Sequence, residues 1–261
     1  MSVLLATITG IRIVTRSRSS AILAEVNLSY TSMTKTRSVT NTSPLLTIRT
    51  RQICRNGTLA NNPCVMIKVL IACECSQVEC SAFRAVGCAA YSCDIQDAYG
   101  SLPQFHIKGD AREVYLSDKW DLVIAHPPCT YLSAAGGNSM YPTAGRIDTE
   151  RYQLMLEGRE LFMWFWHTVT CPLCIENPRP LRCANLPPRS QVVCPSDFGS
   201  PYTKRTYLWL RDLPPLLPTH YHDGHIGSWL SHCSSSKNRR SKAFEGLAAA
   251  MAQQWGTLNY L

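Results

Sequence analysis

A short apolar run that ends at two prolines and a cysteine constrains the fold of this chain most. The run spans residues 120–124 and continues into Ala125-His126-Pro127-Pro128-Cys129-Thr130. Such a run is typical of a buried parallel strand, and the two prolines stop the strand and stiffen the turn. In open α/β sheets, ligands and catalytic groups lie at the carboxyl ends of strands. Cys129 is therefore predicted to be a nucleophile that the rigid turn aims at one atom along one direction. The alternative is a buried cysteine after a proline loop.

A carboxyl group occupies a similar position further along the chain. The apolar segment Leu173-Cys174-Ile175 leads into Glu176-Asn177-Pro178, so Glu176 also stands at the end of an expected strand, just before a proline. A thiol and a carboxyl group are a combination that covalent catalysis with proton transfer can use.

Expected strands and helices alternate from Met66 onward. Strands are expected at residues 68–72, 89–93, 106–108, 121–125, 173–175 and 206–210, and helices at 78–86, 151–167 and 243–255. This alternation predicts an α/β fold with a mostly parallel, doubly wound sheet. The sequence lacks a Gly-x-Gly-x-x-Gly motif, which argues against a bound NAD or FAD.

The first 65 residues differ from the rest in composition. They hold eight of the 26 Arg and Lys residues but one of the 18 acids, so residues 66–261 carry 18 basic and 17 acidic side chains. We predict that residues 1–65 form a disordered extension or precede a native start at Met66. A transit peptide and a nucleic-acid-binding arm are the alternatives. Residues 66–261 suffice for one α/β domain.

Cysteine is abundant, with 13 residues in the chain. The odd number and the lack of an evident secretory signal favour a reducing, cytoplasmic setting over a disulfide scaffold. No apolar run reaches the ~18–20 residues that span a bilayer, so no membrane association is expected. A zinc site formed by four cysteines is an alternative, although one of them lies inside an expected strand, and we predict no metal; the four are Cys171, Cys174, Cys183 and Cys194.

The Pro-Pro-Cys turn, followed downstream by the Glu-Asn turn, resembles two motifs of the cytosine-5 DNA methyltransferase family. The segments from Ile124 to Ser133 and from Ile175 to Pro178 are most similar to small phage-type members. The resemblance extends from about Met66 to Gly256. It implies a Rossmann-like, class I S-adenosylmethionine-dependent methyltransferase fold, with duplex DNA as substrate, in a bacterial or phage-infected cell.

The resemblance also implies roles for particular residues. Cys129 would add to carbon 6 of cytosine, so that carbon 5 becomes nucleophilic. Glu176 would meet ring nitrogen 3 as an acid with a raised pKa, and Asn177 would hold the loop or orient the base. Substrate contacts are expected from Pro128, Lys204 and Arg205. His126 either tunes the thiol or packs beside it.

The expected cofactor site lies at the ends of the first strands. The resemblance implies contacts to S-adenosylmethionine from the following residues: Ala72, Cys73, Glu74, Ser76, Asp94, Asp110 and Pro127. Asp94 is placed to accept the ribose hydroxyls, although acids at strand ends also serve as helix caps. Related phage-type sequences have glycine after the serine, where this chain has Gln77. A positive φ at Gln77 would cost about 1 kcal/mol or more.

The target-recognition region of larger family members is reduced here to a loop at about residues 212–242, followed closely by the last helix. Sequence specificity is therefore expected to be low or to come from a partner protein. The basic cluster at 237–242 could contact phosphates or be solvated. Two alternatives to a DNA methyltransferase remain: a relative acting on another pyrimidine substrate, and a catalytically degenerate nucleic-acid-binding protein.

Overall fold

The structure, a computed structural model, describes residues 66–143, 146–224, 227–229 and 243–257. The predicted extension at 1–65 and the basic cluster at 237–242 lie outside these residues, as does part of the predicted recognition loop.

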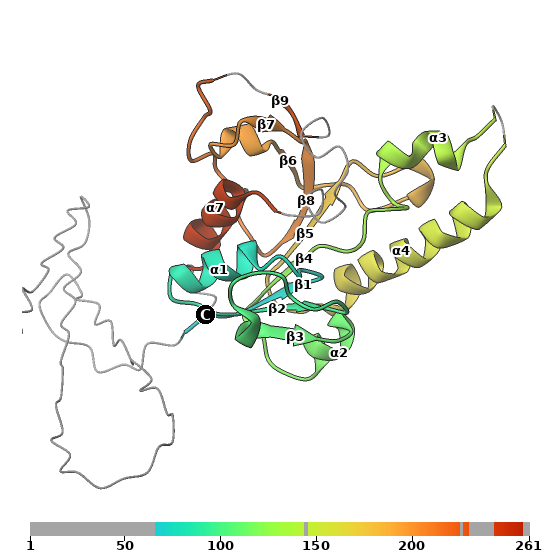
Figure 1. The fold of residues 1–261 in the computed structure, drawn as a ribbon. Coiled ribbons are helices and arrows are strands. Elements are labelled where there is room, and N and C mark those ends of the chain that lie inside the picture. The colour runs from blue at the N-terminus through green and yellow to red at the C-terminus, as the bar shows by residue number, and fades with distance from the viewer. Residues whose placement is uncertain (1–65, 144–145, 225–226, 230–242, 258–261) are drawn as a thin grey trace, which may run out of the picture. The chain divides into compact units, whose positions relative to one another are not determined.

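Seven strands form one central sheet (Figure 1). They are β1 (Lys68–Ala72), β2 (Ala89–Asp94), β3 (His106–Lys108), β4 (Leu122–Ala125), β5 (Leu173–Pro178), β6 (Gln191–Val193) and β8 (Thr206–Arg211). Their order is β3-β2-β1-β4-β5-β8-β6, and β8 runs antiparallel to both of its neighbours while the other pairs are parallel. This arrangement is that of the class I methyltransferase fold, so the predicted fold class is confirmed. A separate parallel pair joins β7 (Tyr202–Thr203) to β9 (Gly227–Ser228).

Helices cover both faces of the sheet (Figure 1). On one face, α1 (Val78–Ala85) packs with α7 (Glu245–Trp255), and on the other face lie α2 (Ala111–Leu116) and α4 (Thr149–Thr168). A short helix, α3 (Gly137–Met140), precedes α4. Four 3₁₀ turns complete the described elements: η1 (Pro103–Phe105), η2 (Ala134–Gly136), η3 (Arg182–Ala184) and η4 (Pro195–Asp197).

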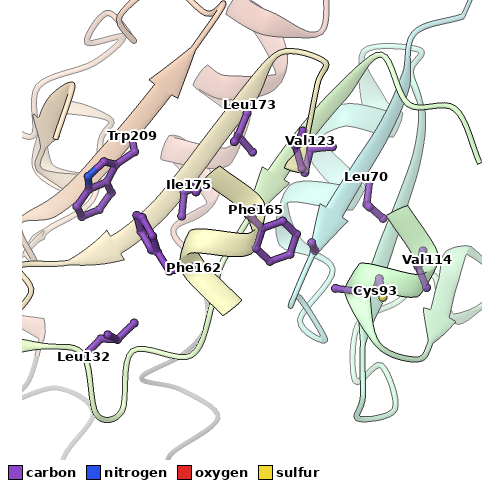
Figure 2. Packing of buried hydrophobic residues seen from close by; sticks show 14 of the residues in the cluster. Leu70, Cys93, Val114, Val123, Leu132, Phe162, Phe165, Leu173, Ile175 and Trp209 are labelled. Carbon is purple, nitrogen blue, oxygen red and sulfur yellow. The ribbon is translucent and has the colours of Figure 1, made fainter. Parts of the chain in front are cut away.

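The alternation of side chains along the buried strands produces two core clusters. Leu70, Val123 and Ile175 face α2 and α4, whereas their sequence neighbours on the same strands face α1 and α7. In the first cluster the ring of Phe162 meets the edge of Trp209 at a centroid distance of 4.9 Å (Figure 2). Strands covered on both faces must be apolar throughout, which explains the apolar runs in the sequence.

The sheet separates the cysteines that the zinc alternative would bring together. Cys174 is fully buried in the cluster beneath α1 and α7, whereas Cys171 and Cys183 pack against the cluster on the opposite face. A tetrahedral site needs its four ligands around one point, so these residues do not form one.

One predicted boundary and two missing elements have identifiable reasons. β5 continues through Glu176, Asn177 and Pro178, because β8 pairs with all three of these residues. The short helix α2 and strand β6 were not predicted, since six and three residues are too few to show a period. None of the described helices combines the length and apolarity that crossing a membrane requires.

Candidate active site

Cys129 lies in the loop after β4, and this loop is fastened to the two strands on either side of β4, namely β1 and β5. The backbone N–H of His126 donates to the carbonyl of Ala72 at 2.9 Å, and the Asn177 amide donates to the carbonyl of Pro127 at 2.8 Å. After the cysteine, its own carbonyl accepts from Ser133 N–H at 2.9 Å. The side chain of Asn177 therefore holds the backbone of the Pro-Pro-Cys turn. Holding this loop is one of the two roles considered for Asn177.

Glu176 is held between His126 and Thr206. His126 Nδ1 lies 3.2 Å from Oε2 of the carboxylate, and the Thr206 hydroxyl donates to Oε1. Burial opposes ionisation of this group, but the hydrogen bond and charge of His126, the charge of Lys204 and the Thr206 hydrogen bond outweigh it and lower the pKa of Glu176 to about 2. The predicted raised pKa is therefore wrong for the free protein, because the sequence did not reveal these partners.

The thiol of Cys129 responds to the same charges. Burial and the negative charge of Glu176 raise the pKa of Cys129, while Lys204 opposes this shift. The cysteine is thus a protonated thiol in the free protein. Neutralising Glu176 would lower its pKa and favour the nucleophilic thiolate.

Behind His126 lies a second acid that the sequence analysis missed. His126 Nε2 is 3.4 Å from Oε1 of Glu79, whose side chain is only 2% exposed. Glu79 stands in the first turn of α1. In the sequence, Glu79 is a carboxylate on an otherwise apolar helix face. This pattern does not reveal a role for Glu79 unless its contact with His126 is known.

A pocket of about 430 Å³ opens next to the Pro-Pro-Cys turn. Of the predicted cofactor residues, Cys73, Asp94 and Asp110 line it, and so does Pro128, which was expected to contact substrate. The lining also includes side chains that the sequence did not suggest, namely Ile95, Gln96, Arg112, Glu157, Glu160 and Leu161.

The other four predicted cofactor residues do not line this pocket. Ala72 is fully buried in β1, and Pro127 is buried in the catalytic loop. Glu74 points into the protein, where Oε1 accepts from the Ser76 hydroxyl at 3.0 Å and from Glu79 N–H at 3.0 Å. Ser76 is therefore bound to Glu74 rather than turned toward the pocket.

Gln77 adopts the positive φ that the sequence comparison suggested, at 60°. Its side chain donates to the carbonyl of Leu102 at 2.6 Å and accepts from Leu102 N–H at 3.0 Å. Gly100 permits this packing, because a Cβ there would lie 2.6 Å from Cβ of Gln77. Gln77 thus anchors the loop after β2. Because its side chain does not line the pocket, a glutamine in place of the expected glycine leaves the pocket open.

The pocket residues fit S-adenosylmethionine in their chemistry. The pocket has the size of an ordinary ligand site, and Asp94 at the end of β2 offers a carboxylate suited to ribose hydroxyls. Asp110 also caps α2, and its paired contacts with Arg112 lower its pKa. Asp110 is therefore an ionised acceptor at the next strand end.

A second pocket of about 340 Å³ is bordered by three exposed arginines, Arg179, Arg182 and Arg189. It is formed by the segment after β5, which pairs with the segment after Cys129: the Leu181 N–H donates to the carbonyl of Leu132 at 2.7 Å. No acidic side chain lines this pocket, and none of the three arginines forms an ion pair with another described residue.

Arg205 and Lys204 stand just before β8. Arg205 is exposed, whereas Lys204 is half-buried and close enough to affect Glu176, Glu79 and Cys129 electrostatically. Among the described residues, no group of three or more His, Cys, Asp or Glu side chains is arranged to hold a metal ion.

No family model and no curated protein matches the chain. Solved structures that are similar include the methyltransferase EhMeth of Entamoeba histolytica (14% identity, TM-score 0.39), a mutant of Spodoptera frugiperda DNMT2 (14%, 0.32) and S. pombe Dnmt2 methyltransferase (12%, 0.33). The matches cover 62%, 62% and 56% of this chain and 58%, 57% and 49% of those chains. The finer resemblance to phage-type members stays a prediction.

Proposed function

We propose that this chain is an S-adenosylmethionine-dependent DNA cytosine-5 methyltransferase. One observation carries the proposal: the thiol of Cys129, on a loop held by backbone hydrogen bonds, lies close enough to the Glu176 carboxylate on the neighbouring strand for its pKa to be raised by that charge, beside a pocket that fits the cofactor. When bound, S-adenosylmethionine would supply the methyl group.

The residues of the chain would divide the chemistry between them. Cys129 attacks carbon 6 of the base, and the electron pair of the carbon 5–carbon 6 bond shifts so that negative charge builds toward ring nitrogen 3. Glu176 faces that nitrogen and passes a proton to it. While Glu176 is protonated, the charge that raises the pKa of Cys129 is absent, so the form of Glu176 that can donate to the base is also the form that favours the thiolate. In a duplex, the base must first leave the stack.

The arginine-lined pocket supports a polynucleotide as substrate rather than a free nucleotide. Its loop is held rigidly: Trp209 Nε1 donates to the carbonyl of Pro187 at 2.8 Å, and Arg159 Nε donates to that of Ala184 at 2.8 Å. Arg189 also stacks on the ring of Tyr207 at 4.6 Å. Guanidinium groups on a fixed loop next to the catalytic turn are suited to neighbouring phosphates.

The function is tested by transfer of labelled methyl from S-adenosylmethionine to cytosine-containing duplex DNA, with single-stranded DNA, RNA and cytidine nucleotides in parallel. We expect label in the duplex, recovered as 5-methylcytosine after digestion. Label in RNA or nucleotides alone would show a different pyrimidine substrate. Cofactor and DNA binding with no transfer to any substrate would show a degenerate relative.

Replacing Arg179, Arg182 and Arg189 singly with glutamine is expected to weaken DNA binding and to reduce the salt dependence of log Kd by about one for each arginine that contacts a phosphate. Cofactor affinity should not change. The control is Lys119→Gln, which removes an exposed positive charge next to the amino-terminal end of β4, away from the catalytic loop. Equal salt slopes for all four variants would contradict phosphate binding at this pocket. Fluorescence anisotropy with labelled duplex at several salt concentrations provides the measurement.

A further inference from the structure

His126 joins two acids that approach it from opposite sides. Nδ1 lies 3.2 Å from Glu176 on β5, and Nε2 lies 3.4 Å from Glu79 on α1. Both acids are largely buried, with side chains 19% and 2% exposed, and the imidazole is 17% exposed. The proposed mechanism uses Glu176 alone, so it leaves the histidine and the second acid without a role.

Glu79 itself stands against a third acid. The Glu74 carboxylate accepts backbone N–H groups of Glu79 and Cys80, at 3.0 and 3.3 Å. Burial, then the charge of Glu79 and a hydrogen bond to its side chain, raise the pKa of Glu74 well above its usual range. Burial also raises the pKa of Glu79, against the hydrogen bond from Glu74. The pair therefore resists carrying two negative charges, as closely spaced buried carboxyls do.

The imidazole is surrounded by charged or titratable groups from every side. Glu79 and Glu176 touch it, Glu74 lies behind Glu79, and Cys129 belongs to its own loop. Lys204, just before β8, acts on both Glu79 and Glu176, and the buried Cys174 thiol is affected by the same two acids. An imidazolium at this point would be opposite in sign to the two carboxyl groups that contact it.

We propose that His126 is a positioning residue that supplies the proton Glu176 passes to ring nitrogen 3, and that Glu79 keeps the imidazole charged until the base arrives. The inference rests on the proposed cytosine chemistry. It gives a role to the two contacts that the basic mechanism leaves unused.

The ionisation of Glu176 requires such a source. A carboxyl group whose pKa is lowered to about 2 is ionised at pH 7 and has no proton of its own to give. The groups that hydrogen-bond to its carboxylate in the described structure are the Thr206 hydroxyl and His126 Nδ1. A hydroxyl does not give up its proton in this way, whereas an imidazolium can pass one to a carboxylate.

The proton balance closes over one catalytic cycle. The Cys129 thiol gives its proton to solvent, and the His126 Nδ1 proton moves through Glu176 to nitrogen 3 as the Cys129 sulfur–carbon 6 bond forms. Neutral His126 keeps its other proton on Nε2, which lies 3.4 Å from Glu79. After carbon 5 is methylated, its proton leaves to solvent and the sulfur–carbon bond breaks; the nitrogen 3 proton then returns through Glu176 to His126, and the Cys129 thiolate regains a proton from solvent.

Two variants separate proton supply from simple positioning. His126→Asn places an amide N–H near the position of Nδ1, so it can still hold Glu176 but cannot titrate. Glu79→Gln removes the negative charge at Nε2 while keeping a similar shape. The readout is the single-turnover rate of methyl transfer, with saturating S-adenosylmethionine and duplex DNA, as a function of pH.

We expect His126→Asn to reduce the rate about 10²-fold or more. The wild-type rate should rise with pH as Cys129 loses its proton, and level off once the imidazolium is lost as fast as the thiolate is gained, because both charged forms are required. In Glu79→Gln the levelling should begin at a pH lower by about one unit, since an adjacent anion favours the charged form. A wild-type rate in His126→Asn, or levelling at an unchanged pH in Glu79→Gln, would overturn the inference and leave the methyltransferase proposal intact.

A second measurement does not depend on turnover. The pKa of the His126 imidazole is followed by NMR titration of protein with labelled histidine, in the wild type and in Glu79→Gln. A lower pKa in the variant supports the role of Glu79, and an equal pKa contradicts it. If the wild type transferred no methyl to any substrate, the proposed function would fail, and this titration would still decide whether Glu79 holds the proton.

Discussion

Replacing Cys129 with alanine is expected to abolish methyl transfer while leaving the affinities for S-adenosylmethionine and duplex DNA unchanged. Without the thiolate, carbon 6 receives no nucleophile and carbon 5 stays unreactive. The loop should keep its shape, because it is held by backbone contacts and by Asn177 rather than by the sulfur. Transfer of labelled methyl, beside calorimetric binding of the cofactor, measures both parts of the prediction.

Cys171→Ala is the matched control, since it removes another half-buried thiol next to the amino-terminal end of β5. It should retain full activity. A duplex with 5-fluorocytosine extends the test, because the missing carbon 5 proton prevents release of the adduct. The wild type should form a covalent complex that survives denaturation, and Cys129→Ala should not. Turnover by the alanine variant would remove Cys129 from the mechanism.

Replacing Glu176 with glutamine is expected to lower the rate of methyl transfer by about 10² to 10⁴-fold. Glutamine keeps the length of the side chain and can still accept from Thr206, but it cannot carry a proton to the base. The same change should lower the pKa of Cys129 and make its thiol more reactive, because the charge of Glu176 helps to raise that pKa. Alkylation of Cys129 near neutral pH should therefore become faster as catalysis becomes slower.

The two readouts make this prediction specific. Glu150→Gln, an exposed acid in the first turn of α4, is the control and should change neither rate. Slow catalysis without faster alkylation would indicate that the variant had distorted the site. An unchanged rate of methyl transfer would show that Glu176 plays no part in proton transfer.

The strands of this fold were predictable because their signals are local. β1 and β3 have the predicted bounds, and β4 differs from its prediction by one residue. Buried parallel strands leave continuous apolar runs, and prolines mark where they stop. From these signals alone, Cys129 could be placed after the carboxyl end of β4 and Glu176 in the carboxyl-terminal half of β5, which lie at one edge of the sheet.

The protonation and surroundings of the site could not be predicted in this way. Glu79, His126 and Glu176 come from three elements and are separated by 47 and 50 positions in the chain. A pKa depends on burial and on neighbouring charges, so the low pKa of Glu176 exists only once these groups are assembled. The direction of the Gln77 side chain likewise depends on Leu102, a contact that no local pattern encodes.

The sequence by itself determined the class of fold, the strand ends and the pairing of a thiol with a carboxyl group, because hydrophobic period and proline stops act over a few residues. Tertiary structure alone decided which acid is ionised, which side chains face the cofactor pocket, and that His126 bridges Glu79 and Glu176. These properties depend on distances of a few ångströms between segments far apart in the chain, which only the packing of helices on the sheet establishes.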